Sequence, residues 1–554
     1  MRTAATKDGR TVVGIAGKHA VLLAFKWPQK EFKGLLGFAI QRKQGNRESI
    51  WLPTVINFPD VEITKGQLHS SSEVPVQSMI WNDFGLSENK TRNGLPAGTK
   101  FIYTVIPIRG TAAAQIRMIE ESVNIELSTE AEHELGSDLP EVHFNRGLSD
   151  SQEYERLFGE LHNPKHDQLA LNWLARDLDT NLLKFVDRAV QNKTLLVDMA
   201  AYHLDYKPLI NAICQIGNRA RVSLDWGPEE KHAQKPGPNG PAYQRLKEAG
   251  VMVHQREHVS ISHNKYIVLK SADGSPLGVL TGSTNFTQGG ISTQSNQSVI
   301  VHNAKLADAY LKDFERVLQN DNVDLRDDNQ QGAVIDDTLE VFFSPHASNN
   351  RPDLDRLTEL AKAAKSSRLF MTFRMTDVAL IEAMLDDSAT VFGVADRVYR
   401  GNDNSGDRLI FDEAHRSYPR VVACNAPLFD EPEEGALYAE LKRDMYNPIV
   451  HHKIIILDWD KPTCVVVTGS ANYSTNSTAH NDENSLIVHG DQRLAEEYLV
   501  EFSRLFTHWQ LRWLRERGTH DHRPEYLATD SSWTKIWKTD GKPAEFLALV
   551  AGTH

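Results

Sequence analysis

The first part of the chain alternates short apolar runs with polar turns, which is the pattern of β-strands. Runs of strand length lie at 19–27, 35–43, 76–83, 100–108 and 122–128. Turn-forming residues separate them, as in Asn-Gly-Leu-Pro-Ala-Gly before the fourth run. Strands joined by turns, without intervening helices, predict a small antiparallel β-sandwich.

The pattern changes in the next part of the chain, where strand-like runs alternate with helical ones. Apolar strands are predicted at 195–202, 221–227 and 250–255, and a helix is predicted to begin near Pro208. Such alternation predicts an α/β layer architecture.

A sequence repeat covers most of this α/β region. His-x-Lys occurs at 263–265 and again at 451–453, and Gly-Ser-x-Asn occurs at 282–285 and again at 469–472. The helix that follows repeats its apolar positions in the same register: Leu306, Tyr310, Phe314 and Leu318 against Leu494, Tyr498, Phe502 and Phe506. Both sets have the i, i+4 spacing of a buried helix face. A motif, a strand and a helix in one register predict two copies of one α/β unit.

Each His-x-Lys motif stands just before or on an apolar strand, at 266–269 and 454–457. Alternation along a strand puts the histidine and the lysine, two positions apart, on the same side. A second strand in each copy then ends in the Gly-Ser-x-Asn motif. Two such units facing each other would join two imidazoles, two ammonium groups and two amides in one pocket.

This set of groups suits the cleavage of a phosphodiester. Ammonium and amide groups bind the non-bridging oxygens and stabilise the charge of a five-coordinate phosphorus. One imidazole can attack phosphorus while the other protonates the leaving oxygen. No metal or other cofactor is expected, because no acidic cluster lies near the motifs. The candidate residues are His263, His451, Lys265, Lys453, Asn285 and Asn472 for catalysis, with Ser283 and Ser470 for substrate binding.

The paired motifs resemble the phospholipase D superfamily, whose signature is His-x-Lys-x4-Asp followed by Gly-Ser-x-Asn and, further on, a glutamate. The second copy has the whole pattern: His451, Lys453, Asp458, Gly469, Ser470, Asn472 and Glu483. The resemblance implies two mixed sheets flanked by helices and related by a pseudo-two-fold axis. It also implies a covalent phosphohistidine intermediate.

The first copy departs from this signature at two positions. Lys270 replaces the aspartate, which the family uses mainly as a structural support, the role expected for Asp458. Asn296 stands where the second copy has Glu483, and we count it among the groups near the substrate. In the superfamily these partners reach across the pseudo-two-fold axis. On that pattern Glu483 supports His263 as the nucleophile, and Asn296 supports the histidine of the second copy as the general acid. The reversed assignment stays open.

The substrate is less well defined by the sequence than the reaction. A net charge of −13 argues against a protein that coats nucleic acid. The segments 289–301 and 481–488 look like those of bacterial phospholipase-like members, which favours a phospholipid or another small phosphodiester. The aromatic and hydroxyl residues after each motif asparagine look like those of nucleases, so DNA or RNA is the alternative. A second alternative is a catalytically weak scaffold or binding protein.

These patterns divide the chain into four parts. We expect the β-sandwich at 1–132, the first phospholipase D-like unit at 133–328, the second at 329–515 and a C-terminal tail at 516–554. The segment 95–105 resembles the approach to the penultimate strand of fibronectin type III domains. We expect the sandwich to serve targeting, substrate positioning or packing.

The location of the protein is predicted from what the N-terminus and the apolar runs lack. Lysines and a histidine break the first thirty residues, which do not read as a signal peptide. No run approaches the ~20 apolar residues that span a bilayer, so we expect no insertion into a membrane. A soluble, cytoplasmic protein is expected. Export without an N-terminal signal and the oligomeric state are left open.

Overall fold

The structure is a computed structural model of the 554-residue chain. It describes residues 2–59, 61, 67–85, 90, 94–132, 139–147, 151–159, 162–227, 238–257, 259–319, 332–346, 350–397, 419–424, 449–516, 526–538 and 542–552.

The first α/β region is built on a seven-stranded mixed sheet. In spatial order its strands are β12 (Glu141–Phe144), β18 (Gln297–Val301), β17 (Pro276–Gly282), β16 (Lys265–Lys270), β13 (Leu196–Ala201), β14 (Ala220–Asp225) and β15 (Met252–Arg256). The last three run parallel to one another, and the remaining neighbours pair antiparallel. The strand that carries the first motif lysine is therefore central and is buried along its whole length.

The second α/β region has an eight-stranded sheet with the same order of strands after one extra edge strand. Its strands are β19 (Ala333–Val334), β20 (Leu339–Ser344), β26 (Glu483–His489), β25 (Val465–Gly469), β24 (Lys453–Leu457), β21 (Ser367–Thr372), β22 (Thr390–Ala395) and β23 (Val421–Ala423). The parallel and antiparallel pairings also follow the first sheet. β24 consequently has the central place that β16 has in the first sheet.

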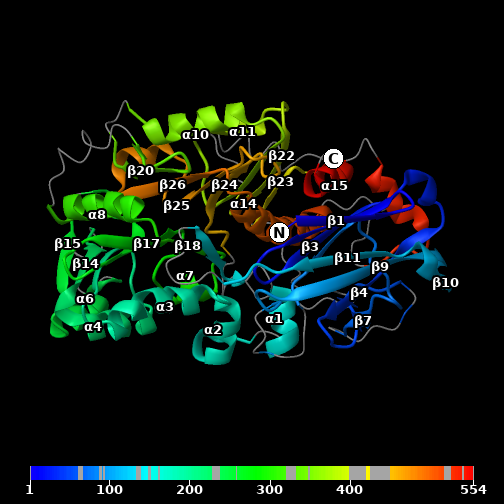
Figure 1. Ribbon diagram of the computed structural model, residues 1–554, viewed down its shortest axis with the longest axis horizontal. Coiled ribbons are helices and arrows are strands. Elements are labelled where there is room, and N and C mark those ends of the chain that lie inside the picture. The colour runs from blue at the N-terminus through cyan, green and yellow to red at the C-terminus, as the bar shows by residue number, and fades with distance from the viewer. Residues whose placement is uncertain are drawn as a thin grey trace.

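Helices cover both sheets in layers (Figure 1). α3 (Leu178–Gln191), α4 (Lys207–Ile216) and α6 (Gly240–Glu248) pack on the outer face of the first sheet, and α10 (Pro352–Ala363) and α11 (Val378–Leu385) on that of the second. Between the sheets lie α8 (Ala304–Gln319) and α14 (Gln492–Glu516). The predicted apolar faces of these two helices are confirmed, because they supply Leu306, Tyr310 and Phe314, and their counterparts on α14, to the central core.

Strand alternation explains how the first sheet serves two cores at once. Tyr266 and Val268 face the central core, whereas Ile267 and Leu269, on the same strand, face the outer helices. Shorter elements complete the α/β regions: α1 (Ser151–Phe158), η4 (Pro164–His166), α2 (Gln168–Ala175), η5 (Gly217–Arg219), α7 (Gln288–Ser292) and α13 (Thr475–His480).

The N-terminal region consists of antiparallel strands, as expected from its pattern. One sheet contains β1 (Arg2–Lys7), β2 (Arg10–Ala16), β3 (Val21–Lys26) and β8 (Ile80–Asp83). The other contains β10 (Ala114–Arg117), β9 (Lys100–Thr111), β4 (Leu35–Gln44) and β5 (Ile50–Trp51), with β11 (Val123–Ser128) also on β9. β6 (Pro53–Thr54), β7 (His69–Ser70), η1 (Gln29–Glu31) and η2 (Ile119–Glu121) lie in the connections. Phe25 and Phe38, one from each sheet, share a core, their ring centroids 4.9 Å apart.

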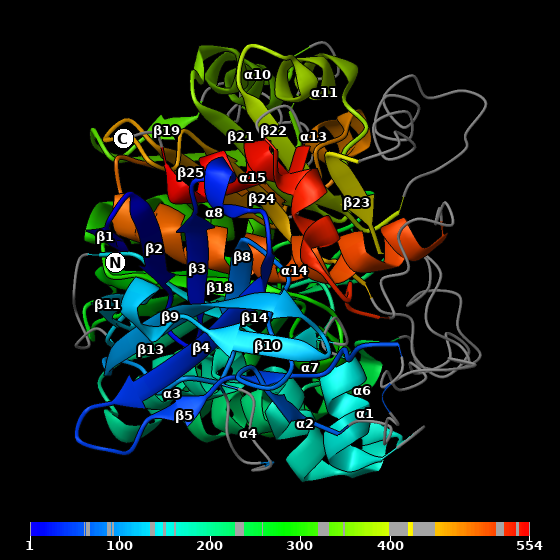
Figure 2. The same cartoon turned by 90° about the vertical axis from the view of Figure 1, so that its right-hand side faces the viewer.

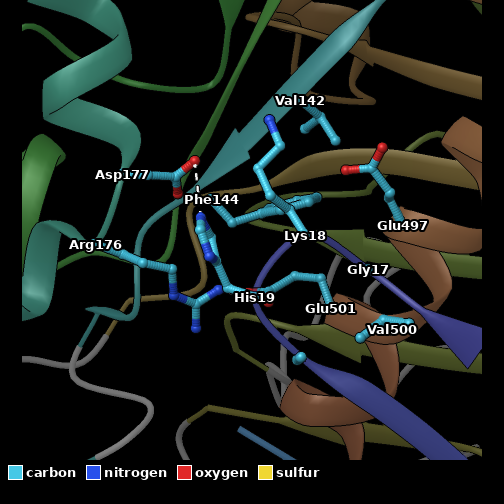
Figure 3. Close-up of a pocket in the computed structure, with 11 residues that line it drawn as sticks. Gly17, Lys18, His19, Val142, Phe144, Arg176, Asp177, Glu497, Val500 and Glu501 are labelled. Carbon is cyan, nitrogen blue, oxygen red and sulfur yellow. Dashed lines mark ion pairs between the residues drawn. The ribbon is translucent and has the colours of Figure 1, made fainter. Parts of the chain in front are cut away.

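The four-stranded N-terminal sheet also packs against the α/β regions (Figure 2). Val13, Ile15 and Leu22 belong to the central core together with α14. Around the turn between β2 and β3 the contact becomes polar, with Lys18 2.5 Å from Glu141 and His19 3.3 Å from Asp177. Figure 3 shows this junction, where the turn faces Glu497 and Glu501 of α14.

The C-terminal segment, for which we expect a tail, contains structure that packs on both parts of the molecule. η6 (Ser531–Trp537) places Trp533 in the core of the N-terminal sheets. α15 (Lys542–Ala551) adds Phe546 and Val550 to the central core. Among the described residues, no helix is long and apolar enough to cross a membrane.

Candidate active site

The two motif histidines lie at places where the repeats exchange backbone hydrogen bonds. The N–H of His263 donates to the carbonyl of Asp482, and the N–H of His451 donates to the carbonyl of Ser295, each at 2.9 Å. Each acceptor immediately precedes the residue expected to support that histidine. The two exchanges are equivalent, so the repeats bring both histidines to their common boundary.

A carboxylate of the second repeat binds the histidine of the first. Nδ1 of His263 lies 2.7 Å from Oε2 of Glu483, and both side chains are almost completely buried. The other carboxylate oxygen accepts hydrogen bonds from Oγ of Ser477 at 2.6 Å and from Nδ2 of Asn481 at 3.3 Å. This is the pairing that the sequence predicts, and the two donors hold the carboxylate in one orientation.

An amide of the first repeat binds the histidine of the second. Nδ1 of His451 lies 2.9 Å from Oδ1 of Asn296 and 3.0 Å from the carbonyl of Ser283. The amide Nδ2 donates to the carbonyl of Gly290 at 2.9 Å, which leaves its oxygen for the imidazole. Because a backbone carbonyl can only accept, Nδ1 of this ring carries a proton and Nε2 is the nitrogen left for chemistry.

Each lysine folds back onto the loop of its own motif, over an aromatic ring. The ammonium groups of Lys265 and Lys453 donate to the carbonyls of the motif histidines. They also lie over the rings of Tyr202 and Phe373, at 5.2 and 5.0 Å. The same rings lie 4.9 and 5.0 Å from the two imidazoles. Sequence reasoning missed this aromatic pair, which follows β13 and β21 directly.

The glycine of each Gly-Ser-x-Asn motif allows a close approach to the neighbouring strand. Gly282 and Gly469 have φ values of 146° and 141°, where side chains are disfavoured. A Cβ would lie 2.4 and 2.2 Å from the carbonyl oxygens of Gln297 and Asn484. β17 and β25 can therefore pair up to their last residue with β18 and β26, and each motif asparagine follows three residues later.

The motif serines differ from the expected role in substrate binding. The hydroxyl of Ser283 donates to Oδ1 of Asn296 at 2.9 Å, and that of Ser470 accepts from the backbone N–H of Asn484 at 3.0 Å. Both side chains are fully buried. Asn296 is likewise fully buried and engaged with the imidazole. The geometry thus gives these three residues supporting positions behind the site.

The motif asparagines have capacity left for a ligand. Asn285 and Asn472 are half-buried. Within the described residues neither side-chain oxygen has a hydrogen-bond partner. Buried polar groups are normally paired, so these amides suit the oxygens or hydroxyls of a bound substrate.

The aspartate position of the motif is structural in the second copy. Asp458 accepts the backbone N–H groups of Lys365, Ser366 and Ser367, at 3.0, 2.6 and 3.1 Å from Oδ1. The first copy uses another solution, in which Lys270 makes an ion pair with the buried Asp198. The departure at that position therefore leaves the fold supported.

Burial and like charges favour the uncharged forms of the basic groups. Burial lowers the pKa of His263 to about 4 and that of Lys265 to about 7. Burial, then the two ammonium groups and the first imidazole, keeps the pKa of His451 well below its usual range. Burial and the other ammonium group do the same to the pKa of Lys453. A bound anion would reverse these shifts, because its charge stabilises the protonated forms.

Glu483 remains a carboxylate in this setting. Burial raises the pKa of Glu483, but His263 and Lys265 outweigh that effect and bring it below its ordinary value. Among the described residues, no three His, Cys, Asp or Glu side chains gather in a way that would hold a metal ion.

Solved structures of other proteins resemble parts of this chain at low sequence identity. Phosphatidylserine synthase from Haemophilus influenzae aligns with 67% of this chain and 93% of its own, at 13% identity and a TM-score of 0.41. Polyphosphate kinase from Porphyromonas gingivalis aligns with 58% of this chain, at 16% identity and a TM-score of 0.37, and only 44% of the kinase is covered. Nuc, a phospholipase D family member from Salmonella typhimurium, aligns with 32% of this chain and 93% of its own, at 23% identity and a TM-score of 0.20.

The comparison with curated proteins finds no match. A family model described as "Cardiolipin synthase, PLD-like domain" matches residues 188–318 and 357–506, just over half of the chain. Both segments contain one copy of each motif. With its mixed α/β sheets and paired His-x-Lys motifs, the chain belongs to this phospholipase D-like family.

Proposed function

We propose that the protein is a metal-independent phosphodiesterase that works through a covalent phosphohistidine. Phosphodiesterase chemistry is typical of the family. The observation that supports a phosphohistidine mechanism is that each repeat binds the motif histidine of the other. One imidazole is bound by a buried carboxylate and the other by a neutral amide. Because the two partners differ in charge, we assign different catalytic roles to the two imidazoles.

His263 is proposed as the nucleophile. Its Nδ1–H donates to Glu483, so the lone pair of Nε2 is available to attack phosphorus. The phosphorylated ring is a cation, and the carboxylate stabilises it. The P–O bond to the leaving group breaks as the P–N bond forms. Lys265, Lys453, Asn285 and Asn472 are proposed to bind the non-bridging oxygens.

His451 is proposed as the general acid and then the general base. Negative charge on the bound substrate raises the pKa of this imidazole, so that Nε2 can carry a proton. That proton goes to the leaving oxygen. In the second step water attacks phosphorus, the same Nε2 takes a proton from the water, and the P–N bond breaks to release His263.

The proposed substrate is a phospholipid or another small phosphodiester. A net charge of −13 is unfavourable for a surface that follows a polyanion. A nuclease is the second candidate, favoured by the aromatic residue after each motif asparagine, Phe286 and Tyr473. The third is a catalytically weak scaffold, since the first repeat lacks the family's aspartate and glutamate.

We also propose that a pseudo-two-fold axis relates the two α/β units, at 133–328 and 329–515, and that residues 1–132 form a fibronectin type III-like β-sandwich. The equal strand order of the two large sheets supports the axis. The shared core of the two N-terminal sheets supports the sandwich. In the expected tail at 516–554, the described segments 526–538 and 542–552 pack on the N-terminal sheets and on the central core.

The test is turnover of bis-p-nitrophenyl phosphate in EDTA, followed by a panel of phospholipids and nucleic acids in the same buffer. The wild-type protein is expected to be active, and His263→Ala and His451→Ala are each expected to lose several orders of magnitude. Because p-nitrophenolate leaves without protonation, the His451→Ala variant should still release a first equivalent of it and then stall as a phosphoryl-enzyme on His263, since the general base of the second step is missing.

Activity that vanishes in EDTA and returns with Mg²⁺ or Zn²⁺ would contradict the mechanism. An adduct trapped on His451 would reverse the two roles. Absence of turnover across the whole panel would favour the scaffold.

A further inference from the structure

Two buried aspartates stand at equivalent ends of the two sheets, next to the motif loops. Asp225 ends β14, and its Oδ1 accepts the backbone N–H of Ser262 at 2.6 Å. Asp396 follows β22, and its Oδ1 accepts the backbone N–H of Val450 at 3.0 Å. The accepting groups are 8% and 4% exposed. In each repeat the N–H belongs to the residue just before the motif histidine.

The signature of the family does not include these carboxylates, and sequence analysis does not select them as site residues. The hydrogen bond is nonetheless the same in both copies. In each, Oδ1 of the aspartate accepts a backbone N–H from the same place in the motif loop. In both copies the interaction acts on the backbone that leads directly into the motif histidine. The place of the hydrogen bond, one residue before each motif histidine, is what ties these carboxylates to the site.

We infer that Asp225 and Asp396 are positioning residues for the proposed reaction, each holding a motif histidine's loop by a backbone hydrogen bond and placing a negative charge beside the neighbouring lysine. This inference rests on the proposed function only for its kinetic readout. The hydrogen bond fixes the backbone from which the imidazole and the ammonium both project.

The electrostatic part of the inference follows from the groups around each lysine. Burial lowers the pKa of Lys265, while Glu483 from β26 and Asp225 from β14 raise it. Lys453 from β24 adds a like charge nearby. Tyr202 and His203, after β13, also lie close, and burial then Lys265 lower the pKa of His203 to about 4, so that ring stays neutral.

The second lysine has a matching environment. Burial and then Lys265 lower the pKa of Lys453, while Glu483 and Asp396 raise it. Arg397 lies 3.4 Å from the same aspartate but is 45% exposed, so solvent weakens its opposing charge. Glu483 serves both lysines, and each aspartate serves one. Without the aspartates, the two lysines would have a single carboxylate between them.

The experiment separates the charge from the backbone hydrogen bond at each position. Asp225→Asn and Asp396→Asn keep an oxygen that can accept the N–H but remove the charge. In the kcat/KM profile against pH, which reports groups of the free enzyme, the alkaline limb is expected to move down by about one unit. At pH 8 the loss is then on the order of tenfold.

Asp225→Glu and Asp396→Glu make the complementary change, since they keep the charge and displace the oxygen. The alkaline limb is expected to stay in place while kcat falls at every pH. Asp377→Asn is the matched control: this buried aspartate also accepts a backbone N–H, from Leu380 at 3.0 Å, but starts α11. That variant should melt at a lower temperature and keep the wild-type profile.

A direct titration of the lysines makes the test independent of turnover. In protein labelled with ¹⁵N at lysine Nζ, the signal absent from Lys265→Arg should titrate about one unit lower in Asp225→Asn than in wild type. The signal absent from Lys453→Arg should likewise titrate lower in Asp396→Asn than in wild type. Unchanged titrations and an unchanged alkaline limb in both Asn variants would overturn the inference. Lack of turnover in the wild type, with shifted titrations, would refute the proposed function alone.

If an Asn variant does not fold, the Glu variant at that position provides the test. An unchanged kcat in the Glu variant would show that the hydrogen bond does not position the motif loop, and would overturn the inference.

Discussion

Glu483→Gln is the substitution that tests the asymmetry of the site most directly. The change keeps the size of the side chain and removes its charge, so a neutral amide would replace the carboxylate beside His263. Glu483 is 1% exposed and 2.7 Å from the imidazole of His263, so solvent cannot replace the lost interaction.

The expected loss has two parts that add. A hydrogen bond to a buried charged group is worth about 1.5–3 kcal/mol, which corresponds to about 10- to 150-fold in rate. The second part comes from the partners of the far oxygen. In their present orientation Ser477 and Asn481 both donate to the far oxygen, which favours the glutamine oxygen there and the new NH₂ group toward His263. The imidazole must then accept at Nδ1 and carry its proton on Nε2, where it cannot attack.

Together these effects predict a fall in kcat of at least about 1,000-fold, because a carboxylate-to-amide exchange that fixes the wrong tautomer costs up to about 10⁴. The assay is release of p-nitrophenolate in EDTA, with the phosphoryl-enzyme measured by acid quench. Formation of the adduct should slow as much as turnover does, since the step affected is the attack on phosphorus.

Glu340→Gln provides a matched control on the same sheet. Glu340 lies 2.7 Å from His489, in a Glu–His pair of the same length at the other end of β26. The control is expected to keep the wild-type kcat. Should Glu483→Gln retain more than a third of the activity, or should both variants lose equally, the assignment of His263 as the supported nucleophile fails.

Two further outcomes concern stability. The free energy of unfolding, from urea titrations, should fall by on the order of 3 kcal/mol between pH 6.5 and 4 through His263 alone, because the unfolded imidazole binds a proton near 6.5 and the folded one near 4. His263→Ala should show a shallower slope, and an equal slope would contradict the shift. A chain that begins at residue 139 should melt at least about 5 °C below the full chain, because α14 loses its contacts with the N-terminal sheet, and an unchanged melting temperature would refute that packing.

The strands and helices of the repeats could be predicted because burial imposes a regular pattern on them. β16 and β24 are buried on every residue, and past the motif lysine each has a continuous apolar run, at 266–269 and 454–457. α8 and α14 bury one face at i, i+4 spacing. β1 was missed for the converse reason: its side chains are exposed or half-exposed, so its sequence carries no apolar signal.

The site was predictable where its residues belong to a motif and not where they depend on tertiary packing. Tyr202 and Phe373 occupy equivalent positions after β13 and β21, but they are 171 residues apart, not the 188 that separates the motif histidines. A search at the motif's own offset therefore passes over them. Trp533 and Phe546 pack on cores formed by segments far away in the sequence. The local pattern near the C-terminus does not predict such contacts.

The crossing of supports between the repeats has a consequence for how such a chain can change over evolutionary time. A duplicated unit is ordinarily free to drift once its twin keeps the original task. Here each copy holds the group that orients the other copy's imidazole, through Glu483 and Asn296. A substitution at either residue is therefore felt first by the reactive ring of the opposite copy. A substitution in one repeat therefore changes the chemistry of the other, so the two repeats are expected to diverge together and to take complementary roles in one reaction.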